Sequence, residues 1–335
     1  MTPLEKAQKK LVNLTYRLIE LRNYLPGKYI GPGANVRIFN KKIRPPYSCS
    51  IVAVDHCNLS CLDCDHASPV VRRKFADSSE LMPGLKNLSE VYRPRTLNLV
   101  GGEPLLHPKL VELIQAMKTV GLGKHVSLMT NAVLLNRLSD QFWDEINALE
   151  LSVYPETVVN ETFLEGIKLQ AQKHHVKLSA YAFDKFRTTF SSRGTADSDL
   201  ARRIFRTCEK AHLWGCHTIS GRHLYKCAQC IYVTQIPGTR AGHDFTEDGV
   251  PLDNKKGLFG QLYDYFDSDQ PLKACGYCLG TVGKIHPHKF AKPDELAASH
   301  NRPTEDLIDY KRLEELEKGL GTFVEHRNLI FKINA

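Results

Sequence analysis

Apolar and polar positions alternate along residues 49–200 in the rhythm of strands and helices taken in turn. Five apolar runs have strand length: Ser50–Val54, Thr96–Val100, Val126–Met129, Leu149–Val153 and Val176–Ala182. Helical periodicity separates them, at about Leu85–Tyr92, His107–Val120, Asn136–Ile146 and Asn160–Lys173. Because parallel strands need crossover connections, the alternation predicts an α/β fold with a parallel sheet and helices outside it.

The N-terminal segment has a different pattern. Apolar residues recur in steps of three and four from Leu4 to Leu25, which predicts a helix that Pro26 and Gly27 end. Residues 1–50 hold ten Lys and Arg against two acids, so the net charge of +8 lies there. A basic helix of this kind can cap the following domain, self-associate, or meet an acidic partner such as an anionic membrane surface.

The rest of the chain divides by composition. Residues 184–199 are polar and predict a linker or mobile loop, and residues 304–320 predict a last helix. Beyond Arg206 the helical and strand periodicity fades and cysteines become frequent. We therefore expect four segments: a basic helical segment 1–48, a core 49–200, a cysteine-rich module 201–290 and a helical segment 291–335.

Composition indicates a soluble protein of a reducing compartment. Of the 335 residues 42% are hydrophobic, and no apolar stretch approaches the roughly 18 residues that span a bilayer. The first 25 residues are too charged for a secretory signal. Ten cysteines without such a signal argue against a disulfide scaffold and favour the cytoplasm.

Two motifs follow the first two predicted strands. Cys57, Cys61 and Cys64 are spaced Cys-x3-Cys-x2-Cys, and a run Gly-Gly-Glu-Pro covers 101–104. Three thiolates on one loop can hold three irons of a [4Fe–4S] cube and leave the fourth iron open. Taken singly, the triplet also suits a structural metal site or buried thiols, and the second motif suits an ordinary strand-to-helix turn.

Together, the two motifs resemble those of the radical S-adenosylmethionine (radical SAM) enzymes. The resemblance implies a partial (β/α)6 TIM-like barrel with both motifs at the carboxyl ends of strands. It implies a [4Fe–4S] cluster whose open iron binds SAM through the amino and carboxylate groups. It also implies reductive cleavage of SAM to a 5′-deoxyadenosyl radical, which takes a hydrogen atom from the substrate.

The same resemblance assigns the SAM contacts. Gly101 and Gly102 would let the backbone approach the methionyl group, and Glu103 would accept a hydrogen bond from its ammonium. Thr130 and Asn131 would lie near the ribose.

Three further positions qualify this assignment. Ala132 replaces the Gly that the family often has after Thr-Asn. Ser152 is either a ribose or carboxylate contact or a solvent-facing strand residue. The family usually has an aromatic residue, near the adenine, where this chain has Asp63.

A second set of cysteines follows at 208, 216, 227, 230, 275 and 278. The two Cys-x2-Cys pairs alone could make a four-cysteine zinc site. The resemblance implies instead a twitch-type module with one auxiliary [4Fe–4S] cluster on Cys208, Cys227, Cys275 and Cys278, although Cys216 could replace Cys208 and Cys230 could replace Cys227. The longer SPASM variant would need more cysteines than remain.

The spare cysteines bear on the reaction. Cys49 is expected to be a buried thiol, whereas Cys216 and Cys230 either pack or give a hydrogen atom to a substrate radical. A thiol donor would make the enzyme an epimerase. Electron loss to the auxiliary cluster would make it a dehydrogenating oxidoreductase.

The substrate class rests on a short motif. Residues 65–69, Asp-His-Ala-Ser-Pro, resemble radical SAM proteins of sugar and surface-polysaccharide pathways. A sugar or polyol, phosphorylated or nucleotide-linked, is therefore expected, with His286 and His288 as polar contacts or bases. An acidic flavodoxin or ferredoxin would supply the electron, and no nucleic-acid-binding motif is present in the sequence.

Two rival functions remain. One is a radical SAM maturase of a ribosomal peptide, although residues 1–48 are too short and helical for the usual winged-helix recognition domain. The other is a zinc-binding protein without enzyme activity.

Overall fold

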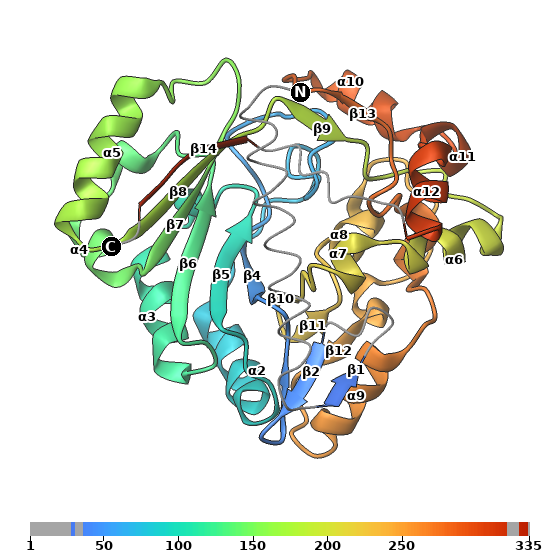
Figure 1. Ribbon diagram of the computed structural model, residues 1–335, viewed down its shortest axis with the longest axis horizontal. Coiled ribbons are helices and arrows are strands. Elements are labelled where there is room, and N and C mark those ends of the chain that lie inside the picture. Colours follow the sequence, from blue (N-terminus) through green and yellow to red (C-terminus); the bar gives the residue numbers. More distant parts are fainter. Residues whose placement is uncertain (1–27, 31–35, 320–327, 334–335) are drawn as a thin grey trace.

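A nine-stranded sheet forms the centre of the computed structural model, which describes residues 28–30, 36–319 and 328–333 (Figure 1). The strand order is β12-β11-β10-β4-β5-β6-β7-β8-β14. Six neighbours are parallel: β10 (Thr218–Ser220), β4 (Ser48–Val54), β5 (Thr96–Gly101), β6 (His125–Thr130), β7 (Ala148–Val153) and β8 (Lys177–Ala182). Antiparallel strands flank them: β11 (His223–Tyr225), β12 (Gly249–Pro251) and β14 (Asn328–Ile333). The parallel α/β sheet predicted from the sequence is confirmed.

Helices follow the parallel strands and cover one face of the sheet (Figure 1). They are α2 (Ser78–Val91), α3 (Leu110–Val120), α4 (Asp140–Glu145) and α5 (Glu161–Lys173). In α2, Leu81, Leu85 and Leu88 share one face and are buried in the main core. Asp77 caps this helix by accepting a hydrogen bond from the Ser79 amide at 2.8 Å.

Two helix starts differ from the prediction for local reasons. The cap at Asp77 starts α2 before residue 85, where the apolar periodicity becomes visible. The helix predicted from His107 begins at Leu110 instead, because Pro108 keeps the preceding residue extended, with ψ at 121°.

The cysteine-rich half of the chain is joined to the same sheet. Its helices are α6 (Ser198–Arg206), α7 (Glu209–His212), α8 (Gln229–Tyr232) and α9 (Leu258–Asp267). Because β10, β11 and β12 extend the sheet from β4, the sheet crosses the expected boundary at residue 200. Short 3-10 helices complete the chain: η1 (Pro104–Leu106), η2 (Leu135–Arg137), η3 (Val233–Gln235), η4 (Phe245–Asp248) and η5 (Lys273–Tyr277).

The expected linker at 184–199 is wrong. It contains β9 (Lys185–Arg187), which pairs with β13 (Ile285–Pro287), and its residues 188–192 are buried. Three of the four hydroxyls in this buried stretch have partners: Thr188 donates to Asp63 at 2.8 Å, Thr189 donates to Asp65 at 2.6 Å, and Ser191 donates to the Arg302 carbonyl at 2.6 Å.

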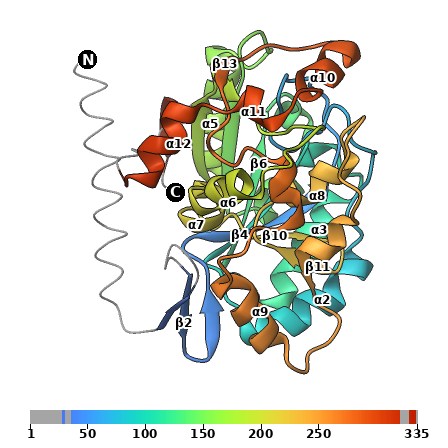
Figure 2. The same cartoon turned by 90° about the vertical axis from the view of Figure 1, so that its right-hand side faces the viewer.

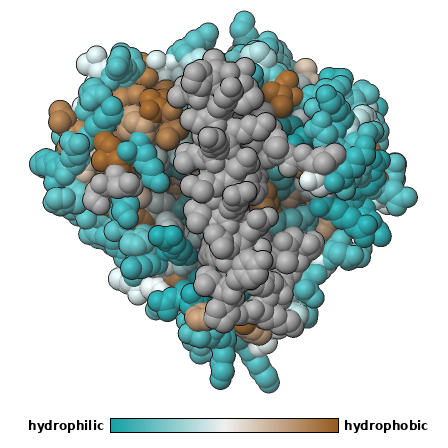
Figure 3. Space-filling view, viewed as in Figure 1, coloured by the Kyte–Doolittle hydropathy of each residue, from teal (hydrophilic) through white to brown (hydrophobic). Residues whose placement is uncertain are grey.

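The last predicted helix is also corrected. It is split into α11 (Thr304–Leu307) and α12 (Tyr310–Glu317), because Asp309 caps a new helix by accepting from the Arg312 amide. Figure 2 shows β13 and α10 (Pro293–His300) at one end of the molecule and α2 and α9 at the opposite end. Leu169 on α5 and Ile330 on β14 are exposed apolar residues. Figure 3 shows brown patches on the side of the molecule where Figure 1 has these two elements.

Part of the predicted N-terminal helical segment is a small antiparallel sheet of β1 (Lys28–Ile30), β2 (Val36–Phe39) and β3 (Lys42–Arg44). Asn40 and Lys41 make its tight turn with positive φ angles. The helix predicted for residues 1–25 lies outside the described residues. Within the described ranges, no helix is long and apolar enough to cross a membrane.

Candidate functional site

The first cysteine triplet lies on the loop that leaves the carboxyl end of β4. Burial raises the pKa of Cys57 to about 12, with a further contribution from the neighbouring Cys64. Burial, together with the Cys64 and Cys57 thiols, also raises the pKa of Cys61. The three thiols therefore lie close enough on this loop to influence one another's pKa. Their soft thiolate chemistry fits iron, and their number leaves one iron of a cube without a ligand.

Glu103, at the end of β5, connects this loop to the next strand. It is fully buried, accepts hydrogen bonds from the Thr130 hydroxyl at 2.7 Å and the Asn131 amide at 2.8 Å, and accepts a third from the Leu105 amide. Burial raises its pKa to about 7. Three predicted cofactor residues are thereby brought together, and a carboxylate with three donors retains room for about one more.

Gly101 and Gly102 are required by the packing of the chain itself. A Cβ on Gly101 would lie 2.0 Å from the Val54 carbonyl oxygen, and one on Gly102 would lie 2.0 Å from that of His56. The amide of Gly102 donates to Val54 at 2.7 Å. The two glycines therefore let the Gly-Gly-Glu-Pro turn dock directly on the cysteine loop.

Asn131 reaches the same loop from the end of β6. Its Nδ2 donates to Asn58 Oδ1 at 2.7 Å and lies 3.5 Å from Cys57 Sγ. The following Ala132 has φ of +66°, a conformation that favours glycine. The backbone thus keeps the shape expected of a Thr-Asn-Gly turn although the side chain differs.

Tyr154 was missed by sequence reasoning. It follows β7, its hydroxyl pairs with Ser152, and burial, with the Cys61 and Cys64 thiols nearby, raises its pKa. Ser152 thus faces an aromatic ring that borders the cysteines. Side chains alternate along a strand, and Leu151 is buried. The sequence could therefore have indicated only that Tyr154 and Ser152 lie on the same face.

Asp63, the departure from the family pattern, is buried in a polar network. Its Oδ2 accepts hydrogen bonds from Thr188 and from His286 Nε2 at 2.9 Å, and His300 Nε2 lies 3.4 Å from Oδ1. His286 Nδ1 faces the Pro287 carbonyl at 2.9 Å, so both ring nitrogens face acceptors. The hydrogen bond to Asp63 raises the pKa of His286, which matches a protonated ring.

His288 also contacts the loop: its Nε2 lies 3.2 Å from Cys61 Sγ. That His286 and His288 serve as polar contacts to the substrate or as bases stays a prediction. They lie against the loop because residues 285–291, which we call the strap, run beside it.

The second cysteine set is gathered in the other half of the molecule. Burial raises the pKa of Cys208 to about 11, with Cys227 as the next cause. Burial and the thiols of Cys278, Cys227 and Cys208 raise the pKa of Cys275. The four ligands predicted for an auxiliary cluster are thus mutual neighbours. Among the described residues, no three His, Cys, Asp or Glu side chains converge closely enough for a single metal ion.

The two spare cysteines have different surroundings. Cys230 is buried, and its sulfur donates to the Cys227 carbonyl oxygen at 3.0 Å. Cys216 is half-buried, and the groups that act on its thiol include Lys210 and Asp65, the residue after Cys64. The thiols of Cys227 and Cys208 also act on Cys216, which therefore borders both cysteine sets. The Cys230 thiol interacts with those of Cys227 and Cys275 and lies within the second set.

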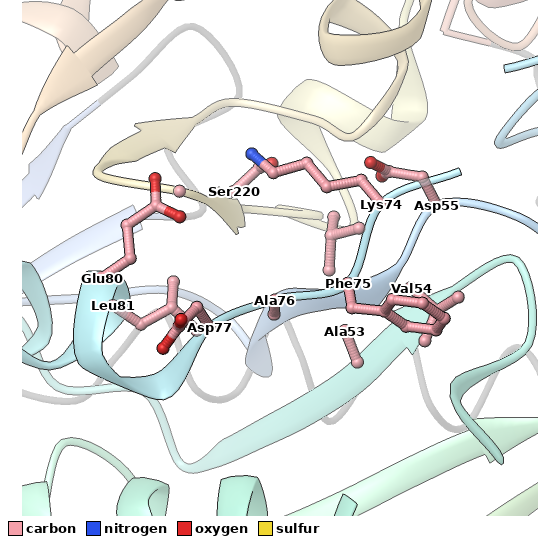
Figure 4. Close-up of a pocket in the computed structure, with 12 residues that line it drawn as sticks. Ala53, Val54, Asp55, Lys74, Phe75, Ala76, Asp77, Glu80, Leu81 and Ser220 are labelled. Carbon is pink, nitrogen blue, oxygen red and sulfur yellow. The ribbon is translucent and has the colours of Figure 1, made fainter. Parts of the chain in front are cut away.

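A shallow cavity lies beside β4 and the start of α2 (Figure 4). Its lining includes Asp55, Lys74 and Glu80, and the Lys74 side chain extends across it toward Ser220. Burial raises the pKa of Asp55 to about 6. None of the residues predicted to bind a cofactor or metal lines this cavity.

Comparison with known proteins supports the radical SAM superfamily for this chain. A protein of Methanothermobacter marburgensis described as a probable GTP 3′,8-cyclase is 27% identical over 140 residues, which cover 40% of this chain and 45% of that protein. A GTP 3′,8-cyclase of a Picosynechococcus species is 35% identical over 121 residues, which cover 34% and 35% of the two chains. The chain therefore spans less than half the length of these curated relatives.

Among solved structures, the crystal structure of BtrN in complex with AdoMet and 2-DOIA is similar to this chain at a TM-score of 0.39 and 15% identity. The match covers 70% of this chain and 93% of that one. No protein-family model matches the chain.

Proposed function

We propose that this protein is a radical SAM enzyme that removes a hydrogen atom from a carbon of a sugar or polyol. One observation carries the proposal: three mutually close thiols lie beside Glu103 and Asn131, where β4, β5 and β6 end. Six parallel strands support the expectation of a partial (β/α)6 barrel, which places reactive loops at this edge.

The residues of the site have distinct tasks in this proposal. Cys57, Cys61 and Cys64 bind three irons of a [4Fe–4S] cluster and leave the fourth open. Glu103 accepts a hydrogen bond from the ammonium of bound SAM with its remaining acceptor capacity. When cluster and SAM are bound and reduced, they supply a 5′-deoxyadenosyl radical. Asn131 holds the cysteine loop through Asn58 and would contact the ribose.

The second cysteine set supports one auxiliary [4Fe–4S] cluster on Cys208, Cys227, Cys275 and Cys278. Such a cluster would accept the electron of a substrate radical, and a base would take a proton from the same intermediate, so that the product is dehydrogenated. Cys216 supports the other outcome. Its thiol gives a hydrogen atom to the opposite face of the radical, the product is an epimer, and an electron and a proton restore the thiol. Of the two spare thiols, the placement of Cys216 suits this donation better.

The remaining assignments complete the proposal. An acidic flavodoxin or ferredoxin would supply the electron, and the net charge of +8 supports such a partner. We also propose that the protein is cytoplasmic and that it contacts a membrane surface weakly. Its sugar or polyol substrate is phosphorylated or nucleotide-linked in this proposal.

The test is anaerobic reconstitution with iron and sulfide, reduction with dithionite, and addition of SAM. We expect 5′-deoxyadenosine from the wild type and none from Cys57→Ala. The matched control is Cys49→Ala, because Cys49 is a buried thiol on β4 outside both sets. Equal 5′-deoxyadenosine from wild type and Cys57→Ala would refute the proposal.

Screening sugars in deuterated water then separates the two reactions. Epimerisation through Cys216 places solvent deuterium at the product carbon, and Cys216→Ala blocks turnover but keeps SAM cleavage. Cys230→Ala serves as the comparison and should keep turnover. Metal analysis distinguishes the auxiliary cluster from a zinc site. Two [4Fe–4S] cubes give near eight irons per chain, whereas zinc bound by the second cysteine set would refute the auxiliary cluster.

A further inference from the structure

The strap, residues 285–291, adds a short stretch of backbone pairing to the first cysteine loop. Leu62 donates its amide to the Lys289 carbonyl at 3.0 Å, and Ala291 donates to the Ser60 carbonyl at 2.9 Å. Cys61 and Phe290 form an antiparallel bridge between these bonds. The side chain of a strap residue is therefore held in a fixed position relative to Cys61.

His288 is the strap residue that faces the thiol. Its Nε2 lies 3.2 Å from Cys61 Sγ, within hydrogen-bond range for sulfur. Three rings clamp the imidazole: Tyr154 stacks on it with ring centres 5.1 Å apart, and Phe186 and Phe290 meet it edge-on at 4.9 and 5.0 Å. An apolar ring would fill this clamp equally well, so a histidine there calls for a polar explanation, and Cys61 supplies the partner.

We infer that His288 is a positioning residue for the first cluster, which donates an N–H···S hydrogen bond to Cys61 and raises the cluster's reduction potential. A thiolate bound to iron can only accept, so Nε2 carries the proton. A hydrogen bond to a ligand sulfur favours the reduced cluster, because that state carries more negative charge. The inference rests on the proposed open-iron cluster.

The test compares cluster potentials, not turnover. His288→Phe removes the donor and keeps an aromatic ring in the clamp. His288→Gln keeps an N–H donor. Reconstituted proteins are poised at one solution potential. The EPR spin count of the reduced signal that responds to SAM, compared with the count after full reduction, gives the reduced-to-oxidised ratio of the first cluster. We expect a roughly tenfold lower ratio for His288→Phe, equivalent to 59 mV for one electron, and a ratio near wild type for His288→Gln.

Two controls address packing. Lys289→Ala changes an exposed side chain of the strap, and Phe290→Leu loosens the clamp without touching a donor. Both should keep the wild-type ratio. The inference is overturned if His288→Phe keeps the wild-type ratio, or if Phe290→Leu lowers it as much.

Two further outcomes separate the possible failures. If His288→Phe takes up no iron, the test rests on His288→Gln. A reduced-to-oxidised ratio near wild type in that variant supports the donor role of His288, and a ratio lowered tenfold overturns it. If wild-type protein itself shows no signal that responds to SAM, the proposed function fails first.

Discussion

The Lys210 ammonium lies 2.5 Å from Oδ1 of Asp65, and the pair joins the two cysteine sets. Asp65 directly follows Cys64, whereas Lys210 is buried near Cys208 and Cys278. Burial alone would lower the pKa of Lys210, but Asp65 and the nearby thiols raise it above its ordinary value. A charged lysine therefore lies between the two cysteine sets, where it would offset the negative charge of metal-bound thiolates.

Lys210→Met should destabilise the protein. The substitution leaves Asp65 without its cation, although the partial exposure of Asp65 and solvent screening limit the loss to about 1–3 kcal/mol. Urea denaturation of the reduced, metal-free protein measures this loss. Lys273→Met is the control, since its pair with Glu247 is exposed; equal midpoints for the two variants would contradict the bridging role.

His212 should make stability depend on pH. Burial lowers its pKa to about 4, below the ordinary 6.5, and its Nε2 donates to the Phe205 carbonyl at 2.7 Å. Between pH 6.5 and 4, His212 is protonated in the unfolded chain but neutral in the folded chain. The free energy of unfolding therefore falls as pH falls through this interval. Relative to His212→Gln, which cannot titrate, wild type should lose roughly 3 kcal/mol over this interval. A pH-independent difference between the two would disprove the assignment.

Ala132→Gly should stabilise the turn that holds Asn131. The left-handed backbone at φ +66° destabilises an alanine by about 1–2 kcal/mol. Glycine avoids this strain but loses more conformational entropy on folding, so the net gain is smaller. We expect a net gain of about 0.5–1 kcal/mol in thermal or urea unfolding. Ala171→Gly, in α5, is the matched control and should lose about 1 kcal/mol. Losses of similar size in both variants would show that the turn is unstrained.

Gly102→Ala should separate the Gly-Gly-Glu-Pro turn from the cysteine loop. Its Cβ would meet the His56 carbonyl oxygen at 2.0 Å, and backbone atoms cannot move away cheaply. We expect a loss of about 3 kcal/mol in urea unfolding. Gly260→Ala, where no atom lies within 4 Å of the new Cβ, should be neutral or stabilising. A neutral result for Gly102→Ala would contradict the close docking.

The sequence was a good guide wherever a local pattern is sufficient. The apolar runs located β4 to β8, and the spacing of Cys57, Cys61 and Cys64 located the first thiol site. Both are short-range features, in which neighbours along the chain decide the structure. The hydrogen bonds of Glu103 with Thr130 and Asn131 were not predicted, although these residues follow runs that are neighbouring strands of the sheet.

Long-range pairs were beyond sequence reasoning. The prediction of a linker at 184–199 failed because the partners of Thr188 and Thr189 are carboxylates more than 120 residues away. The contact of His288 with Cys61 spans 227 positions. A polar residue looks the same in a sequence whether water or a buried carboxylate satisfies it.

The open iron is tested most directly by EPR of the reduced protein with SAM labelled with 17O in its carboxylate. We predict a signal that SAM changes and that 17O broadens, because the labelled oxygen is bound to a cluster iron. The signal should vanish in the triple variant Cys57→Ala, Cys61→Ala, Cys64→Ala. A spectrum that SAM does not change, or a SAM-dependent signal that persists in the triple variant, would contradict the account.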